Sequence, residues 1–409
     1  AEGRARLVAI TGEAGIGKSR LAKEFMNIVD GYAEDVYWHQ GRSPSYGDGV
    51  PMWSLIEMVR QRAGILEDEE DARARTRLRT MLAEYVADAD DRHWIEGWLA
   101  GLLGLADMPA GSRAELLSAL RSLFRHIAER GTTVLVFEDL HWADDAVVEF
   151  ITELVDRTTR APILVIALAR PELLDRHPGF GSQQRASVNV SLAALGDDDM
   201  RNAVSEHLAG VDTELVDRIV ERAAGYPLYA AEIIRMLTND GSLIEVAAGF
   251  EWTGDAADLA IPDTLQAVIG ARIDRLDPAH RSLLQDAAVL GLTFQPAALR
   301  ALAGCSDEDV DDALRHLVRL DVLEVVDDQR SPERGQYRFV QGLIQELAYD
   351  RLHRAERRSR HLAAAAYFER DDDPELAGIV AKHYEGAFEA SPEGPERDEL
   401  VQRAIDSLI

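Results

Sequence analysis

The fold of this chain is decided by the stretch Gly12-Glu13-Ala14-Gly15-Ile16-Gly17-Lys18-Ser19 near its start. An apolar run before it, residues 6–11, predicts a buried strand, and residues 20–25 after it predict the first turns of a helix. A strand, a glycine loop of the form GxxxxGK[ST] and a helix are together typical of a phosphate-binding loop. Its glycines let successive backbone N–H groups point at one anion, and the helix N-terminus adds partial positive charge. The sequence therefore predicts a nucleoside triphosphate site; an incidental glycine turn fits this context less well.

Two side chains of the loop have expected roles of their own. Lys18 would reach the β- and γ-phosphates, and the hydroxyl of Ser19 would bind Mg²⁺. The chain has only three lysines beside 41 arginines. A compact ammonium on a flexible stem suits a phosphate, which supports the assignment of Lys18.

Composition limits the other possibilities. The 409 residues predict two to four domains, and a hydrophobic content of 46% can build proper cores. The net charge of −29 argues against non-specific binding to nucleic acid or to an anionic membrane. The single cysteine, Cys305, suits a reducing cytoplasm, and no apolar run is long enough for a membrane span. The start at Ala1 and an unfinished helical pattern at the other end predict a piece of a longer protein.

A second half of the phosphate site is predicted at residues 132–139, an apolar strand that ends in two acids. One carboxylate would hold Mg²⁺ and its neighbour would orient or deprotonate the attacking water. By position, Glu138 is the metal-side acid and Asp139 the water-side acid, with Asp139 also near the metal. The alternative is an acidic strand-to-helix turn, in which Asp144 or Asp145 caps the next helix.

Arg170 follows the next predicted strand, residues 161–169. Ligands of an open parallel sheet sit at the carboxyl ends of its strands, so Arg170 is a candidate for sensing the γ-phosphate. A surface ion pair is the alternative. Residues 36–40 and 186–192 predict the remaining strands, and 41–49 a loop, which makes this part a doubly wound α/β nucleotide-binding domain. Trp94 and Trp98, four residues apart on one helix, fit a helix core better than a ligand slot.

Helices dominate from Asp197 onward, interrupted by a possible hairpin at 242–253 and a linker at 254–262. Helices followed by two short β-runs, 322–326 and 337–340, predict a winged helix. Its candidate recognition helix opens with acidic residues 307–312, which phosphates would repel, so we expect no DNA binding. The basic stretch 351–360 fits a solvated or inter-domain helix face better than an anion site. Paired helices after it predict the start of an α-solenoid.

With these residues placed, the chain resembles the STAND class of signal-transduction P-loop ATPases, and within it the ATPase modules of large LuxR-type transcription regulators and multidomain adenylate cyclases. The stretches that carry the resemblance span nearly the whole chain in order; they are residues 12–21, 46–51, 137–144, 169–173, 225–228 and 337–346.

The resemblance implies four parts: a P-loop nucleotide-binding domain, a helical lid, a winged helix and the start of TPR-like repeats, at 1–195, 196–260, 261–355 and 356–409. It also implies that Pro227 lies against the adenine, although the Gly-Tyr-Pro turn alone fits a helix cap and a helix-starting proline. Relatives often carry a histidine that contacts the ADP phosphate, and Gln341 stands at that position; an amide adds no positive charge, so a weaker ADP contact is expected. The expected nucleotide contacts are Gly12, Glu13, Ala14, Gly15, Ile16, Gly17, Lys18, Ser19, Arg20, Arg170, Pro227 and Gln341, and the expected metal contacts are Ser19, Glu138 and Asp139.

Such proteins resemble switches, in which ADP holds a closed monomer, and ATP with an inducer permits opening and assembly. The leading hypothesis is therefore a slow regulatory ATPase that uses ATP, ADP and Mg²⁺, with Lys18, Asp139 and Arg170 as catalytic residues and an inducer acting through the C-terminal repeats. A nucleotide-gated scaffold without significant hydrolysis is the alternative. A phosphotransferase is a third possibility, but no acceptor site with its own base stands out.

Overall fold

A five-stranded parallel sheet organises the first part of the chain. The computed structural model describes residues 3–30, 36–43, 51–66, 69–182, 186–246, 249–253, 261–327, 331, 333–371 and 376–408. The sheet has the order β2-β3-β4-β1-β5, and all its pairings are parallel. Its strands are β1 (Arg6–Thr11), β2 (Val36–Arg42), β3 (Thr132–Glu138), β4 (Ile163–Ala169) and β5 (Ser187–Ser191). The predicted α/β P-loop fold is confirmed.

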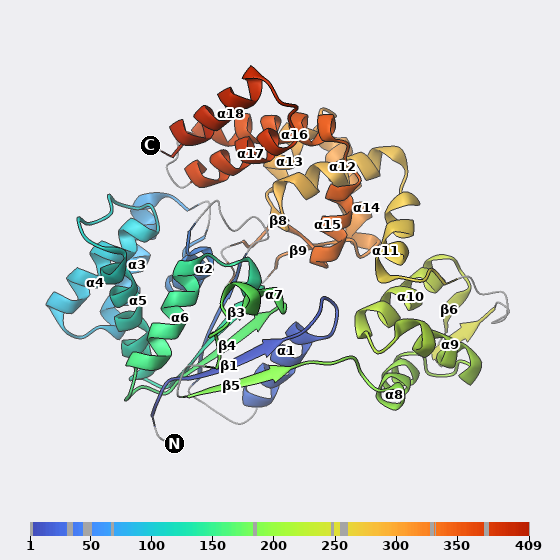
Figure 1. The fold of residues 1–409 in the computed structure, drawn as a ribbon, viewed down its shortest axis with the longest axis horizontal. Coiled ribbons are helices and arrows are strands. Elements are labelled where there is room, and N and C mark those ends of the chain that lie inside the picture. Colours follow the sequence, from blue (N-terminus) through green and yellow to red (C-terminus); the bar gives the residue numbers. More distant parts are fainter. Residues whose placement is uncertain are drawn as a thin grey trace.

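Helices cover both faces of this sheet (Figure 1). Alternation along β3 shows the two layers: Val134 and Val136 pack with Ala22 of α1, whereas Leu135 and Phe137 join the larger core on the other face. That core includes buried residues of α2 to α6. The covering helices are α1 (Lys18–Asp30) on one face and α2 (Trp53–Ala63), α3 (Asp71–Tyr85), α4 (Ala89–Leu102), α5 (Arg113–Ala128) and α6 (Asp145–Arg157) on the other.

A helical unit with its own core follows the sheet. Buried residues of α8, α9 and α10 form this core, which a two-stranded hairpin joins through Leu243. The hairpin confirms the strands expected in 242–253. The elements, after the short α7 (Glu172–Arg176), are α8 (Asp197–His207), α9 (Thr213–Ala223), α10 (Pro227–Asn239), β6 (Leu243–Val246) and β7 (Gly249–Trp252).

A small antiparallel sheet lies in the next unit, with the order β8-β10-β9. Two strands were expected from the sequence, and the third, β8 (Thr293–Phe294), is too short to give a pattern of its own. The other elements are α11 (Leu265–Asp274), α12 (Pro278–Leu290), α13 (Pro296–Ala303), α14 (Asp307–Arg319), β9 (Leu323–Val325), β10 (Tyr337–Phe339) and α15 (Gly342–Asp350).

Three helices end the described chain: α16 (Arg354–Phe368), α17 (Ala377–Glu389) and α18 (Pro395–Asp406). The basic stretch before and within α16 pairs with acids of earlier helices, and its part in α16 joins two units, as expected. Arg351 pairs with Asp274 of α11 at 3.1 Å, and Arg360 pairs with Asp286 of α12 at 2.6 Å. Among the described residues, no helix combines the length and the apolar composition that crossing a membrane requires.

Two expectations from the sequence are wrong, and others concern residues outside the described part of the chain. Gly41 and Arg42 continue β2, although a glycine followed by polar residues predicted a loop there. Trp98 is buried in the core, but Trp94 is 38% exposed, so the two tryptophans do not share one environment. Most of the expected loop, the motif at 46–51 except Pro51, and linker residues 254–260 lie outside the described residues.

Candidate functional site

The phosphate loop joins the C-terminal end of β1 to the N-terminus of α1, as predicted. Gly15 and Gly17 have φ values of 77° and 107°, a backbone region that side chains other than glycine rarely adopt. The ammonium of Lys18 donates to the carbonyl oxygens of Gly12 and Glu13, at 2.7 and 2.9 Å. The loop thus has the strained, glycine-dependent curl that lets backbone N–H groups converge on an anion.

The other side chains of the loop differ in their surroundings. Ile16 is buried, Ala14 is partly buried, and Ser19 and Arg20 are exposed. The guanidinium of Arg20 pairs with Glu24 of the same helix at 2.7 Å. Arg20 therefore takes part in an exposed ion pair within α1, a kind of contact that stabilises a protein only slightly.

Later parts of the chain contact the loop directly. The backbone N–H of Leu228, in the first turn of α10, donates to the carbonyl of Gly15 at 3.3 Å. A Cβ on Gly15 would lie 2.8 Å from Cβ of Leu228, so only glycine allows this approach. Pro227 begins α10 beside this contact, which places the residue expected near the adenine next to the phosphate loop.

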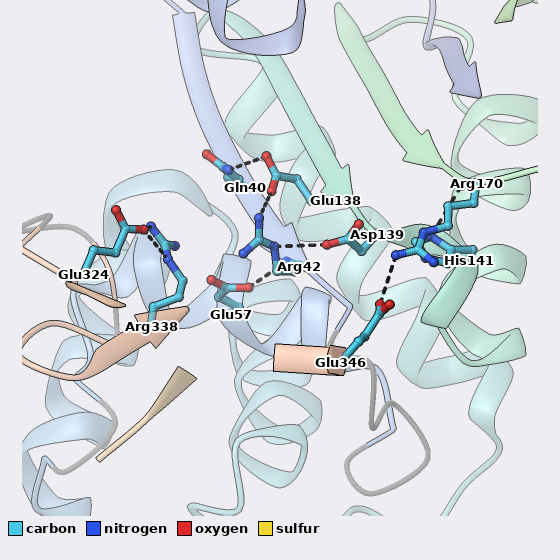
Figure 2. A network of polar contacts seen from close by, with 10 residues as sticks. All are labelled: Gln40, Arg42, Glu57, Glu138, Asp139, His141, Arg170, Glu324, Arg338 and Glu346. Atoms are coloured by element: carbon cyan, nitrogen blue, oxygen red, sulfur yellow. Dashed lines mark hydrogen bonds and ion pairs between the residues drawn. The ribbon is translucent and has the colours of Figure 1, made fainter. Parts of the chain in front are cut away.

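The two acids at the end of β3 are both paired with one arginine (Figure 2). Arg42 of β2 lies 2.7 Å from Glu138 and 3.4 Å from Asp139. Burial alone would lower the pKa of Arg42, but the charges of Glu138 and Asp139 outweigh burial and raise it above its ordinary value. Gln40 donates to the other oxygen of Glu138 at 3.0 Å. Both oxygens of Glu138 are therefore engaged by side chains of β2.

Asp139 itself has a left-handed backbone, with φ 51° and ψ 37°. It ends β3 and starts a short 3-10 helix, η1 (Leu140–Trp142). Asp144 then caps α6 by accepting from the backbone N–H groups of Ala146 and Val147. The capping role considered for Asp144 is thus real, and it coexists with the acids of the site.

Arg170 stands directly after β4, and its guanidinium contacts a carboxylate from a distant element. Its Nη2 lies 3.0 Å from Oε1 of Glu346, on α15 (Figure 2). Its backbone N–H donates to Nδ1 of His141 at 3.4 Å. Burial, and then the charge of Arg170, lower the pKa of His141 to about 3, so this imidazole is neutral and able to accept.

Asp139 and Arg170 both lie close enough to Lys18 to affect the pKa of its ammonium. Burial lowers the pKa of Lys18; the Asp139 carboxylate opposes this shift, and the Arg170 guanidinium adds to it. The structure thus brings together the three residues expected to be catalytic. They come from the start of α1 and from the ends of β3 and β4, which meet at one edge of the sheet.

Gln341 is engaged elsewhere. Its side-chain amide donates to Glu232 of α10 at 2.9 Å, and its Oε1 is buried without a hydrogen-bond partner among the described residues. Glu232 is 1% exposed and also accepts from Arg235 and Arg272, at 2.7 and 3.0 Å. Gln341 therefore joins the small-sheet unit to the preceding helical unit.

Sequence reasoning missed four residues of this region. Arg42 could have been found from its place at the end of a strand, had β2 been extended through Gly41. Leu228 and Glu346 lie inside stretches that carried the resemblance, but no pattern assigned them a contact. Glu232 had no signal, because Arg272 and Gln341, which bind it from other elements, lie 40 and 109 residues away in the sequence.

A nucleotide and Mg²⁺ fit some of these residues better than others. The loop backbone, Lys18 and Arg170 form a cationic environment that suits phosphate oxygens. Mg²⁺ typically takes one or two carboxylates plus substrate phosphates, and Ser19 and Asp139 supply such oxygen donors. Glu138 fits less well, since Arg42 and Gln40 occupy its two oxygens. Among the described residues, no group of three or more His, Cys, Asp or Glu side chains could hold a metal by itself.

Comparison with known proteins agrees with this geometry. Residues 1–166 match the family model of the AAA ATPase domain. An uncharacterized protein of Rhizobium meliloti (strain 1021) is 24% identical over 414 residues, covering all of this chain and 38% of that protein. A crystal structure of a signal transduction ATPase with numerous domains (STAND) and a tetratricopeptide repeat sensor, from Pyrococcus horikoshii, aligns with 98% of this chain and 48% of its own, at 12% identity and a TM-score of 0.54.

The chain spans less than half the length of each of these two proteins. The likeness in fold extends over nearly all of this chain, beyond the matched ATPase domain. The resemblance to STAND-class P-loop ATPases that the sequence motifs carry is therefore confirmed.

Proposed function

We propose that this chain, which carries an AAA ATPase domain and has the fold of a STAND ATPase, is the nucleotide-dependent switch of a longer signalling or transcription-regulatory protein. It binds ATP or ADP at residues 12–19 and hydrolyses ATP slowly. The nucleotide state sets the position of the later units, and the ATP state permits opening and self-association. An inducer acts through the C-terminal helices, and the protein works in the cytoplasm.

One observation carries this proposal: two later units contact the phosphate site itself. Leu228 of α10 contacts Gly15 of the loop, and Glu346 of α15 pairs with Arg170. A fast hydrolase needs no such contacts, whereas a switch needs a physical route from phosphate to distant units. We accordingly treat 196–260 as a lid, 261–355 as a winged helix and 356–409 as the start of repeats, after a nucleotide domain at 1–195.

The chemistry follows from the residues at the sheet edge. Loop N–H groups and Lys18 hold the phosphates, and Arg170 orients the γ-phosphate with its planar fork of donors. Asp139 orients the attacking water and accepts its proton. Ser19 and Asp139 would hold Mg²⁺, which neutralises charge on the transferring phosphoryl group. Glu138 serves mainly to hold Arg42, and its metal contact is at most indirect.

The scaffold alternative also has an observation in its favour. Arg42 pairs with both acids at the end of β3, so the carboxylate that would activate water is shared with a cation. An arginine that holds this carboxylate restricts the positions in which the carboxylate can meet an attacking water. Binding without significant turnover would follow if Arg42 stays in place when ATP binds.

Steady-state release of phosphate from ATP separates the two functions. We expect slow wild-type turnover that Asp139→Asn abolishes while ATP binding persists, and Lys18→Ala should lose binding as well. Wild-type turnover no faster than that of both variants, with ATP still bound, would establish the scaffold. Phosphate that appears on an added acceptor, and not free in solution, would establish a phosphotransferase.

The nucleotide carried through purification is a second test. Denaturing the purified protein should release ADP, which chromatography identifies. Release of no nucleotide, together with no binding of added ATP or ADP, would contradict the proposal. Size-exclusion chromatography with light scattering should then show larger species in ATP and Mg²⁺ than in ADP.

We do not expect nucleic acid to be a partner of this part of the protein. The first turn of α14 carries Asp307, Glu308 and Asp309, and the chain has a net charge of −29. Phosphate backbones bind basic surfaces, so this helix would be repelled. Retention of duplex DNA by the chain at physiological salt would overturn this expectation.

A further inference from the structure

Glu346 is the acidic partner of the arginine placed to sense the γ-phosphate. The Arg170–Glu346 pair measures 3.0 Å, and the side chains are 23% and 32% exposed. Both are partly shielded from water, so their attraction exceeds that of an ordinary surface pair. Arg170 belongs to the ATPase sheet, and Glu346 belongs to α15, after the small antiparallel sheet.

The cationic surroundings of Arg170 make this pairing significant. Arg170 lies near Lys18, as the effect of its charge on the pKa of Lys18 shows. Its backbone N–H donates to His141, whose side chain carries no charge. Glu346 therefore supplies negative charge at the place where Lys18 and Arg170 would receive a terminal phosphate.

A γ-phosphate and Glu346 compete for the same guanidinium. Both are anions, and placing them on one cation in a partly desolvated site costs more than placing either alone. ADP lacks the γ-phosphate, so it leaves the Arg170–Glu346 pair unchallenged. Glu346 therefore weakens the binding of ATP and leaves the binding of ADP unaffected.

We propose that Glu346 sets the preference of the site for ADP over ATP. This inference rests on the proposed function, because it assumes that residues 12–19 bind nucleotide. Glu346 is a specificity-determining residue that acts through Arg170. Coupling between two sites is reciprocal, so the penalty that Glu346 imposes on ATP equals the penalty that ATP imposes on the α15 contact. ATP binding and release of α15 are therefore one equilibrium.

The test compares affinities for ATP and ADP in the whole chain, with isothermal titration in Mg²⁺. Glu346→Gln keeps the shape and a hydrogen-bond acceptor but removes the charge. We expect ATP to bind about tenfold more tightly, within the usual range of site coupling, and ADP affinity to stay within about twofold. Arg170→Ala should abolish the effect, so that Glu346→Gln changes nothing in that background.

Glu324→Gln is the matched control. Glu324 pairs with Arg338 at 2.6 Å on the same small sheet, and Figure 2 shows the pair well apart from Arg170. This variant should leave both affinities unchanged.

Equal changes for ATP and ADP, no change for either, or the same effect in the Arg170→Ala background would each overturn the role of Glu346. Absence of wild-type binding to both nucleotides would instead overturn the proposed function, and this inference with it. A purely structural effect of Glu346→Gln would move both nucleotides together, so the ratio of affinities distinguishes the two.

Discussion

Gln341 donates a hydrogen bond to Glu232 at 2.9 Å, across 109 residues of sequence. The position at which the family resemblance implies a phosphate contact is thus used, in this structure, to bind a buried acid. Arg235 and Arg272 complete the environment of that acid from α10 and α11. The contact joins the unit that follows the ATPase sheet to the unit that contains α15.

Substitution of Glu232 should destabilise the junction strongly. Glu232→Ala leaves two guanidinium groups and one amide without their shared acceptor at a site that is 1% exposed. Breaking a buried pair in this way costs about 3–5 kcal/mol in the free energy of unfolding. Denaturant titration measures this loss. Asp217→Ala, which removes the exposed partner of Arg201, is the control and should cause no measurable change. Equal effects of the two substitutions would contradict the role of Glu232.

The contact of Gly15 with Leu228 makes a prediction about rescue. Gly15→Ala places a methyl group 2.8 Å from the Leu228 side chain and also pays the cost of a positive φ. The backbone cost alone is about 1–2 kcal/mol, which corresponds to roughly tenfold in nucleotide affinity if binding requires the native loop. Leu228→Gly in the same chain removes both the Cβ and the Cδ2 that this methyl group would meet, and it should recover part of the affinity, as measured by titration with ATP.

Gly17→Ala provides the comparison for that experiment. Gly17 has a φ of 107°, but a Cβ there would meet nothing within 4 Å. Leu228→Gly should therefore give no recovery in the Gly17→Ala background. Recovery of both variants, or of neither, would show that α10 does not press on the loop through Leu228.

Two buried histidines should make the C-terminal helices sensitive to acid. His361 of α16 and His383 of α17 are each 5% exposed, with their Nδ1 atoms 3.0 Å apart. Burial lowers the pKa of His361 to about 4 and that of His383 to about 3, from an ordinary value of 6.5. The unfolded chain therefore binds more protons between about pH 6.5 and 3, so stability is full above this window and is lost as the pH falls through it.

The expected slope is at most about 1.4 kcal/mol per pH unit for each histidine. Hydrogen–deuterium exchange of peptides from α16 and α17 should quicken from pH 6 to pH 4 after correction for the intrinsic rate. His361→Gln with His383→Gln should flatten this dependence, whereas His93→Gln, at an exposed position on α4, should leave it intact. An unchanged profile in the double variant would refute the prediction.

Glu57 gives the opposite dependence on pH. Burial, together with the charge of Glu333 from the small-sheet unit, raises the pKa of Glu57 to about 8 from an ordinary value of 4.5. The folded chain then binds more protons than the unfolded chain between those values, so the free energy of unfolding falls as the pH rises from about 4.5 to 8.

Glu57→Gln mimics the protonated acid and can still accept the 2.8 Å hydrogen bond from the backbone N–H of Arg42. The free energy of unfolding of this variant, relative to that of wild type, should rise by up to about 1.4 kcal/mol for each pH unit between about pH 4.5 and 8. Above pH 8 the difference should stay constant. Denaturant titrations at several pH values provide the curves. Parallel curves for the two proteins would contradict the raised pKa.

Local patterns predicted the parts of the structure that depend on local chemistry. The strands before Gly12, Asp139 and Arg170 were evident because each buried strand is an apolar run, and parallel strands deliver the residues that follow them to one edge. The phosphate loop was evident because its glycines and Lys18 stand at fixed spacings.

Contacts between units could not be read in this way. Glu232, Glu346 and Leu228 acquire their roles from partners more than a hundred residues distant, and nothing in their own neighbourhoods marks those partners. Arg42 was missed for a different reason, because Gly41 suggested a turn where β2 in fact continues. Gly41 lies where Ser54 of α2 approaches the strand, at a distance that excludes a Cβ.

The left-handed backbone of Asp139 restricts what selection can place there. A φ of 51° is tolerated by aspartate, asparagine and glycine and disfavours β-branched and bulky residues. A saturation library at this position should therefore be enriched in these three residues in a screen for folded protein and should return only aspartate in a screen for turnover. The backbone conformation and the chemistry of hydrolysis thus restrict position 139 independently. Asparagine satisfies the first restriction but not the second, so Asp139→Asn is the substitution by which a descendant of this protein could lose hydrolysis and keep its architecture.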